Sequence, residues 1–127
     1  MSIATGSPSL EELMSALAGI KYYVIQMKPT KRWPDRREED LRAHLLWLRD
    51  LELADKVFLS GPLDWDQWDG TGMCVIRAES REEAELIAKG EHFQVNGFRD
   101  NTVREWRVNE GSITFNVKLF TSQWSFR

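Results

Sequence analysis

The sequence predicts an α+β fold whose core elements follow the order β-α-β-β-α-β. Two observations predict it. Stretches rich in β-branched and aromatic residues recur along the chain and indicate strands. Between them, apolar residues repeat every three or four positions after a capping residue, which indicates helices. This order is the ferredoxin-like split βαβ arrangement, here with an added N-terminal helix and an added C-terminal strand.

The first two elements are a helix and a strand. Residues 9–12, SLEE, form a capping box in which Ser9 caps the helix. The apolar face of this helix ends at Gly19, and we expect the helix to pack on the main body as an arm. Residues 20–27, IKYYVIQM, predict the first core strand, with both faces largely covered.

The second helix leads into a pair of strands. Asp35 is placed to cap this helix, which is expected to end near Leu53. Residues 56–62, KVFLSGP, predict the second strand. After the loop LDWDQWDG, residues 71–78, TGMCVIRA, predict the third strand.

The last part of the chain contains one more helix and two strands. A second capping box, SREE at 80–83, opens a helix to about Lys89. Residues 91–98 are expected to form a connecting loop, and residues 100–108 the fourth strand. Residues 112–120, SITFNVKLF, alternate apolar and polar side chains, which predicts a fifth strand with one buried face.

We expect residues 1–127 to form a single domain, because this length suits one hydrophobic core. Within it, residues 1–19 are the arm, 20–108 the core, and 109–127 the extra strand and tail. A four-stranded sheet with both helices on one side leaves its other face uncovered. Two such faces can pair across a two-fold axis, so the sequence predicts a homodimer.

The composition favours a globular protein of the cytoplasm. The chain is 42% hydrophobic and 29% charged, which is ordinary for such proteins. No apolar run approaches the ~18 residues of a membrane span, and the N-terminus has no secretory pattern. The single cysteine, Cys74, lies in a predicted strand, which favours a small buried residue over a nucleophile. We expect no membrane partner.

A nucleic-acid partner is also not expected. The net charge is −3, and the one basic stretch, residues 28–37, is followed at once by acidic residues. Basic side chains around a tryptophan can bind phosphates. Without a second basic stretch, a solvated loop is the favoured interpretation.

One helical stripe contains a histidine. In DLRAHLLWLRDL, residues 40–51, the apolar stripe of Leu41, Leu45, Leu48 and Leu51 also includes His44. The ring is then either a core group with a satisfied hydrogen bond, or it faces a pocket.

These stretches resemble the YciI-like (YCII-related) domain family. The resemblance rests on AHLLWL…VFLSGPL, SREEAELIA…EHF…GF and VREW. Members of that family have a histidine in an AHLxxL motif, a glycine–proline pair seventeen residues later, an S-x-x-E-A helix start and a DPF…G segment. His44 and Gly61 stand at that same interval of seventeen residues. The similarity covers about Ile20 to Val108.

The resemblance implies a dimeric α+β barrel with a histidine–acid pair beside the open sheet face. Some members act on small cyclic or halogenated intermediates of aromatic breakdown. The family histidine corresponds to His44, and the glycine–proline pair to Gly61 and Pro62. The aspartate of DPF corresponds to Glu91, with His92 in place of the proline. This departure keeps a carboxylate but lengthens it, and it frees the backbone.

A histidine–carboxylate pair is a sensible acid–base unit, because the carboxylate orients the ring and the free nitrogen moves a proton. His44 with Glu91 is therefore the candidate catalytic pair. The alternative is a core histidine bonded to a backbone group. His92 either shares the pocket or is solvated. Arg99 and Arg104 either clamp a substrate carboxylate, with Arg104 the chosen candidate, or pair with surface glutamates.

The loop LDWDQWDG does not fit a calcium site, because position five of an EF-hand count is Trp68 and position twelve is Val75. Two histidines without local spacing give no zinc signature. We therefore expect no metal and no cofactor. Trp65 and Trp68 either rim a pocket mouth or pack on a neighbouring subunit.

Two functions remain open. One is a small cofactor-independent enzyme that uses His44 and Glu91 for proton transfer, in an isomerisation or elimination on a small cyclic or aromatic-derived metabolite. Gly61, Pro62, Trp65, His92 and Arg104 are the candidate substrate-binding residues. The other is a small-molecule-binding or dimeric assembly module without catalysis.

Overall fold

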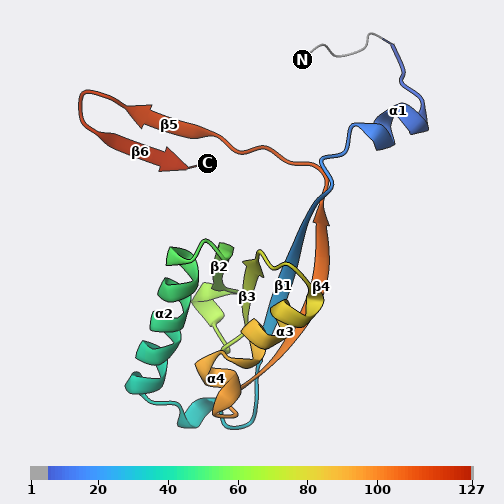
Figure 1. Cartoon of the computed structure of the whole chain (residues 1–127). Coiled ribbons are helices and arrows are strands. Elements are labelled where there is room, and N and C mark those ends of the chain that lie inside the picture. Colours follow the sequence, from blue (N-terminus) through green and yellow to red (C-terminus); the bar gives the residue numbers. More distant parts are fainter. Residues whose placement is uncertain (1–5, 127) are drawn as a thin grey trace. The chain divides into compact units, whose positions relative to one another are not determined.

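The computed structural model describes residues 6–126. These residues fall into two compact units (Figure 1). One unit is Lys21–Arg107, and the other consists of the described parts of Met1–Ile20 and Val108–Arg127.

The larger unit is an α+β structure built on a four-stranded sheet in the order β2-β3-β1-β4. Its strands are β1 (Ile20–Pro29), β2 (Val57–Pro62), β3 (Gly72–Ile76) and β4 (Arg99–Val108). Its helices are α2 (Glu38–Leu53), α3 (Arg81–Lys89) and α4 (His92–Val95). Strand β3 pairs antiparallel with both β1 and β2. The predicted ferredoxin-like order is therefore confirmed, and the sheet does not close into a barrel within the described chain.

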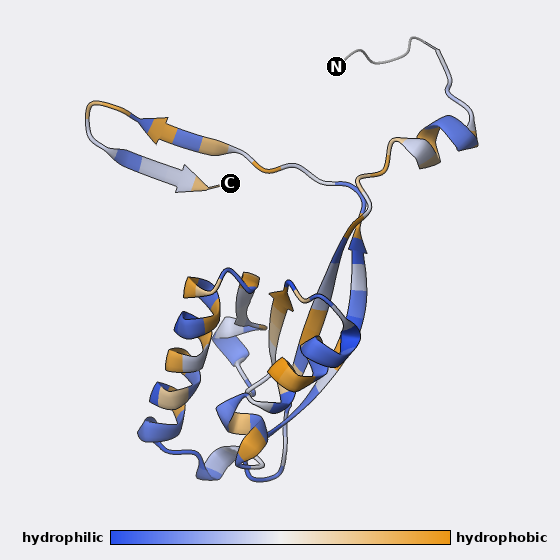
Figure 2. Ribbon diagram, viewed as in Figure 1, coloured by the Kyte–Doolittle hydropathy of each residue, from blue (hydrophilic) through white to orange (hydrophobic). Residues whose placement is uncertain are grey.

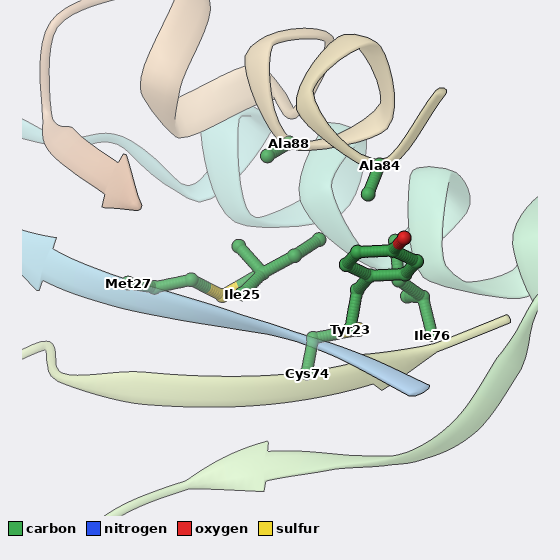
Figure 3. Packing of buried hydrophobic residues seen from close by; sticks show 7 residues of the cluster. All are labelled: Tyr23, Ile25, Met27, Cys74, Ile76, Ala84 and Ala88. Atoms are coloured by element: carbon green, nitrogen blue, oxygen red, sulfur yellow. The ribbon is translucent and has the colours of Figure 1, made fainter. Parts of the chain in front are cut away.

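One face of the sheet packs under the helices. Figure 3 shows Tyr23, Ile25 and Met27 of β1 side by side with Cys74 and Ile76 of β3, beneath α3. They alternate with side chains of the other face, as a strand period of two requires. Figure 2 shows hydrophobic residues on the central strands β1 and β3, whereas the edge strand β4 is largely hydrophilic. The core therefore lies between the middle of the sheet and the helices.

Helix α2 begins at Glu38, two residues later than a cap at Asp35 predicts. Asp35 does not cap it, because Pro34 and Asp35 belong to a separate 3-10 turn, Trp33–Asp35. Arg36 then adopts an extended backbone (φ −64°, ψ 149°), which interrupts the helical path. The cap position is Arg37, whose backbone N–H donates to the carboxylate of Asp40 over 2.9 Å.

The two predicted capping boxes are confirmed at their serines. Ser9 accepts a hydrogen bond from the N–H of Glu12, and Ser80 from the N–H of Glu83. Helix α1, however, is only Leu10–Ser15 and ends before the predicted Gly19. Residues 91–98, predicted to be a loop, contain α4, because Phe93 is fully buried and Glu91 caps the turn.

The C-terminal residues form a hairpin of β5 (Phe115–Lys118) and β6 (Gln123–Phe126), which pair antiparallel in a sheet of their own. The predicted buried face of this strand is wrong for the single chain: Phe115, Val117 and Leu119 are 69%, 64% and 88% exposed. Alternation indicates a strand, but it does not say what covers it. No helix among the described residues is long and apolar enough to cross a membrane.

Candidate functional site

The structure brings His44 and Glu91 together although 46 residues separate them. Nδ1 of His44 lies 2.6 Å from Oε1 of Glu91, and both side chains are buried. His44 projects from the middle of α2, and its ring lies near the rings of Trp47 and Phe93. Nδ1 thus faces a carboxylate, and not a backbone group as the alternative of a core histidine predicts.

Glu91 is fixed by its place at the start of α4. Its Oε2 accepts a hydrogen bond from the backbone N–H of Gln94 over 2.7 Å, as an N-cap side chain does. The amide of Asn101 lies 3.5 Å from the same oxygen. One oxygen of the carboxylate thus caps the helix, and this hydrogen bond orients the other oxygen toward His44.

Arg99 is the third charged member of this cluster. Its Nη1 lies 3.5 Å from Oε1 of Glu91, and its side chain is 3% exposed. Its Nε donates to the carbonyl of Gly70 over 3.0 Å. The guanidinium also stacks near the rings of Trp33 and Phe93, with its carbon 4.8 and 4.9 Å from their centroids. Burial lowers the pKa of Arg99 and the charge of Glu91 opposes this effect; arginine nonetheless stays protonated in proteins.

The contact between His44 and Glu91 is close but not aligned as a hydrogen bond. Nδ1 of His44 and Oε1 of Glu91 are both buried without a hydrogen bond of good geometry. Apo catalytic contacts often have this character and align when a ligand binds. The attraction between the two groups is therefore mainly electrostatic, and it is strongest when His44 carries a proton.

A cavity of about 690 Å³ lies in front of this cluster. That volume lies within the range of small-molecule sites. The helix stripe that contains His44 faces it: Leu41, Leu45 and Leu48 line the cavity beside the ring. The remaining lining residues are Met27, Glu52, Val57, Phe58, Leu59, Ser60, Gly61, Pro62, Trp65, Trp68, Gly72, Phe93 and Arg99. The histidine thus interrupts the stripe where helix α2 meets a mostly apolar pocket.

The loop tryptophans belong to this wall. Trp65 is 70% exposed, while Trp68 is half-buried and donates from its indole N–H to the carbonyl of Thr71. Trp68 also meets the edge of Trp33, with ring centroids 5.5 Å apart. The two indoles line the cavity together with Gly61 and Pro62 of β2.

Two residues predicted to bind substrate lie elsewhere. His92 pairs with Asp40, with Nε2 and Oδ1 2.8 Å apart, and it does not line the cavity. This hydrogen bond lowers the pKa of Asp40. Arg104 is exposed on β4 and does not line the cavity either.

Arg99, and not Arg104, is the arginine that lines the cavity. On β4 the polar residues Arg99 and Asn101 are buried and alternate with the exposed Asp100 and Thr102, but the sequence alone does not show which face of the strand is buried. An arginine on the buried face of a strand is a charge that specific partners must hold.

Cys74 is fully buried, and this burial raises the pKa of its thiol to about 11. Within residues 6–126, no three histidine, cysteine or acidic side chains cluster as metal ligands would.

The profile of the YCII-related domain matches residues 21–107, which is the larger compact unit. The chain belongs to the YCII-related family. The matched range includes both His44 and Glu91, whose side chains meet at 2.6 Å. No curated protein matches the chain.

A solved structure supports the same fold for this YCII-related chain. A 5-chloro-2-hydroxyhydroquinone dehydrochlorinase from Burkholderia phenoliruptrix, in complex with 2,5-dihydroxybenzoquinone, superposes with a TM-score of 0.56. The two sequences are 22% identical, and the match covers 67% of this chain and 92% of the other. At this identity the similarity concerns the fold, and function has to be argued from the site.

Proposed function

We propose that this YCII-related protein is a small cofactor-independent enzyme that transfers a proton on a small cyclic or aromatic-derived metabolite. The observation that carries the proposal is the position of His44. Its ring stands in the wall of a 690 Å³ apolar cavity, with the buried carboxylate of Glu91 2.6 Å behind its Nδ1. This is the arrangement of a base with an orienting acid.

The chemistry depends on which ring nitrogen of His44 carries the proton. Glu91 favours a proton on Nδ1, so Nε2 keeps its lone pair and acts as the base. Nε2 removes a proton from a carbon next to a carbonyl or a ring oxygen. In an elimination, the freed electron pair forms a new double bond and the leaving group departs with its own bonding pair. In an isomerisation, the imidazolium returns the proton to a different carbon.

The elimination branch has the support of the structural neighbour, whose name states that it removes hydrogen chloride from a chlorinated hydroxyhydroquinone. Loss of hydrogen chloride is an elimination that one base and one pocket can perform. The leucine and aromatic lining of the cavity here suits a ring-shaped substrate of similar size.

A second candidate is a binding module without catalysis. It is favoured by the commitment of Oε2 of Glu91 to the helix cap and by the contact of Oε1 with Arg99, which together stabilise the carboxylate as a structural group.

We also propose that the protein is a homodimer. On the sheet face away from the helices, Met73 and Trp106 are 36% and 42% exposed, and a second copy can cover them. A cytoplasmic location stays a prediction.

The test is proton removal itself. A panel of chlorinated hydroquinones and small enolisable lactones is incubated with the protein in D₂O, and chloride release and loss of C–H signals are followed by NMR. We expect turnover by the wild type and a decrease in kcat of roughly 10²–10⁴-fold for His44→Ala.

The matched control is Glu39→Gln, which changes an exposed glutamate of α2 instead of Glu91. Glu39→Gln should retain full activity, whereas Glu91→Gln should lose most of it. If His44→Ala turns over an identified substrate at the wild-type rate, the enzyme proposal is wrong. Binding of panel members without turnover by the wild type favours the binding module.

A further inference from the structure

We propose that the cavity selects a small organic anion, and that Arg99 is the residue that binds its ionised oxygen. The ligand class is an apolar ring that carries one carboxylate, phenolate or enolate oxygen. This inference deepens the proposed function, because it names the charge of the molecule on which His44 would act.

The first observation is the order in which the charged groups stand. Arg99 and His44 both line the cavity, whereas Glu91 is fully buried and does not. The single carboxylate of the cluster therefore lies behind two groups that can be cationic. Once His44 has taken a proton, the three groups sum to one positive charge. In a mostly apolar cavity, an anionic ligand is what compensates this charge.

The other carboxylate in the wall lies away from this cluster. Glu52 is eight residues beyond His44 on α2, or roughly 12 Å along the helix axis at 1.5 Å per residue. The cavity thus has Arg99 and the proton-accepting His44 at one end, which becomes cationic when His44 takes a proton, and an acidic side chain toward the end of α2. This polarity orients an anion with its oxygen at the cationic end.

The second observation is how Arg99 is held. Nε donates to Gly70, and Nη1 lies against Sδ of Met27 and Oε1 of Glu91. The rings of Trp33 and Phe93 stack near the guanidinium. These contacts fix the plane of the group before a ligand arrives. A fixed guanidinium binds an oxyanion with less loss of entropy than a mobile lysine.

The remaining nitrogen, Nη2, lies beside the cavity wall at Gly72. A Cβ added at Gly72 would stand 3.5 Å from Nη2, and Gly72 itself lines the cavity. The glycine therefore leaves the space next to Nη2 without a side chain. An ionised oxygen placed there receives a charge-assisted hydrogen bond. The ligand ring then extends over Phe93 and the leucines of α2, next to the ring of His44.

The test uses benzoate and its uncharged isostere benzamide as probes, with binding followed by the fluorescence of Trp65 and Trp68. We expect benzoate to bind at least about tenfold more tightly than benzamide, as one charge-assisted hydrogen bond implies. Arg99→Met should reduce benzoate affinity by a similar factor and leave benzamide unchanged. Arg49→Met, which removes an exposed arginine of α2, is the matched control and should bind both probes as the wild type does.

The wild-type comparison keeps the proposal testable even if Arg99→Met fails to fold. Equal affinity for benzoate and benzamide, or binding of neither benzoate nor 4-nitrophenolate, overturns it. Comparison of benzoate with 4-nitrophenolate shows whether the site prefers a carboxylate or a phenolate. If benzoate binds in an Arg99-dependent manner and no panel member loses a proton, the anion site stands and the enzymatic function fails.

Discussion

Glu91 faces His44 with one carboxylate oxygen and caps helix α4 with the other. The same residue thus connects the candidate chemistry to the local fold. Because Phe93 of α4, two residues after Glu91, is fully buried against Trp33 and Phe98, the helix cannot move without disturbing this cluster. The position of the carboxylate is therefore set by packing as well as by charge.

The two roles of Glu91 can be separated by substitution. In Glu91→Gln the amide oxygen can still accept from Gln94, so the cap is kept while the charge is lost. We expect activity to fall sharply and unfolding free energy to fall moderately. Both variants leave Arg99 without its buried carboxylate, which costs about 3–5 kcal/mol. Glu91→Ala also loses the cap, worth about 0.5–2 kcal/mol. Urea denaturation measures the stability of each variant; equal stability of the two would show that the cap contributes nothing, and wild-type stability of Glu91→Gln would show that the buried pair contributes nothing.

The tautomer of His44 gives a second prediction. With Glu91 beside Nδ1, neutral His44 should carry its proton on Nδ1 and leave Nε2 bare. Nitrogen-15 chemical shifts of the ring distinguish the two tautomers directly. In Glu91→Gln the neutral ring should shift toward the tautomer with its proton on Nε2, because the amide oxygen caps Gln94 and the amide NH2 then faces Nδ1 and donates to it. A proton on Nε2 in the wild type would contradict the proposed direction of proton transfer.

The pair of Asp40 and His92 predicts a loss of stability in acid. The hydrogen bond from His92 lowers the pKa of Asp40 below its ordinary value of 3.8. A lowered pKa means that the folded state favours the ionised form. The resulting stabilisation is fully present above pH 3.8 and is lost as the pH falls through the folded value. Unfolding free energies measured between pH 6 and 2 should show this loss in the wild type.

Asp40→Asn should remove that component, so the stability of the variant should fall less steeply with acid. Asp100→Asn changes an exposed aspartate of β4 and serves as the control, with a pH profile like that of the wild type. A profile of Asp40→Asn that coincides with the wild type throughout would show that this pair does not contribute.

The sequence predicts much of the larger unit because hydrophobic period and capping residues are local signals. Ser80, for example, caps α3 as its capping box implies. The pairing of His44 with Glu91 depended on the family resemblance, since no local pattern joins residues so far apart. The sequence does not distinguish Arg99 from Arg104, because whether an arginine on a strand is buried depends on Trp33, Gly70 and Phe93, which come from three other segments. The alternation of residues 112–120 predicts a strand, but it carries no information about which segment pairs with that strand or covers it. The pairing of β5 with β6 and the exposure of their side chains therefore do not follow from the sequence.

Gly70 predicts a stability defect that reaches the site. Its φ of +102° is unfavourable for any residue with a side chain, and an added Cβ would clash with the ring of Trp33. Gly70→Ala must therefore displace Trp33 or the backbone carbonyl that accepts from Arg99. We expect a loss of about 1–3 kcal/mol in unfolding free energy. Gly90→Ala is the control, because the nearest atom to its added Cβ is at an ordinary 3.4 Å and its φ is −83°. If Gly70→Ala is as stable as Gly90→Ala and binds benzoate normally, then Trp33 and the Gly70 carbonyl do not hold Arg99 in place.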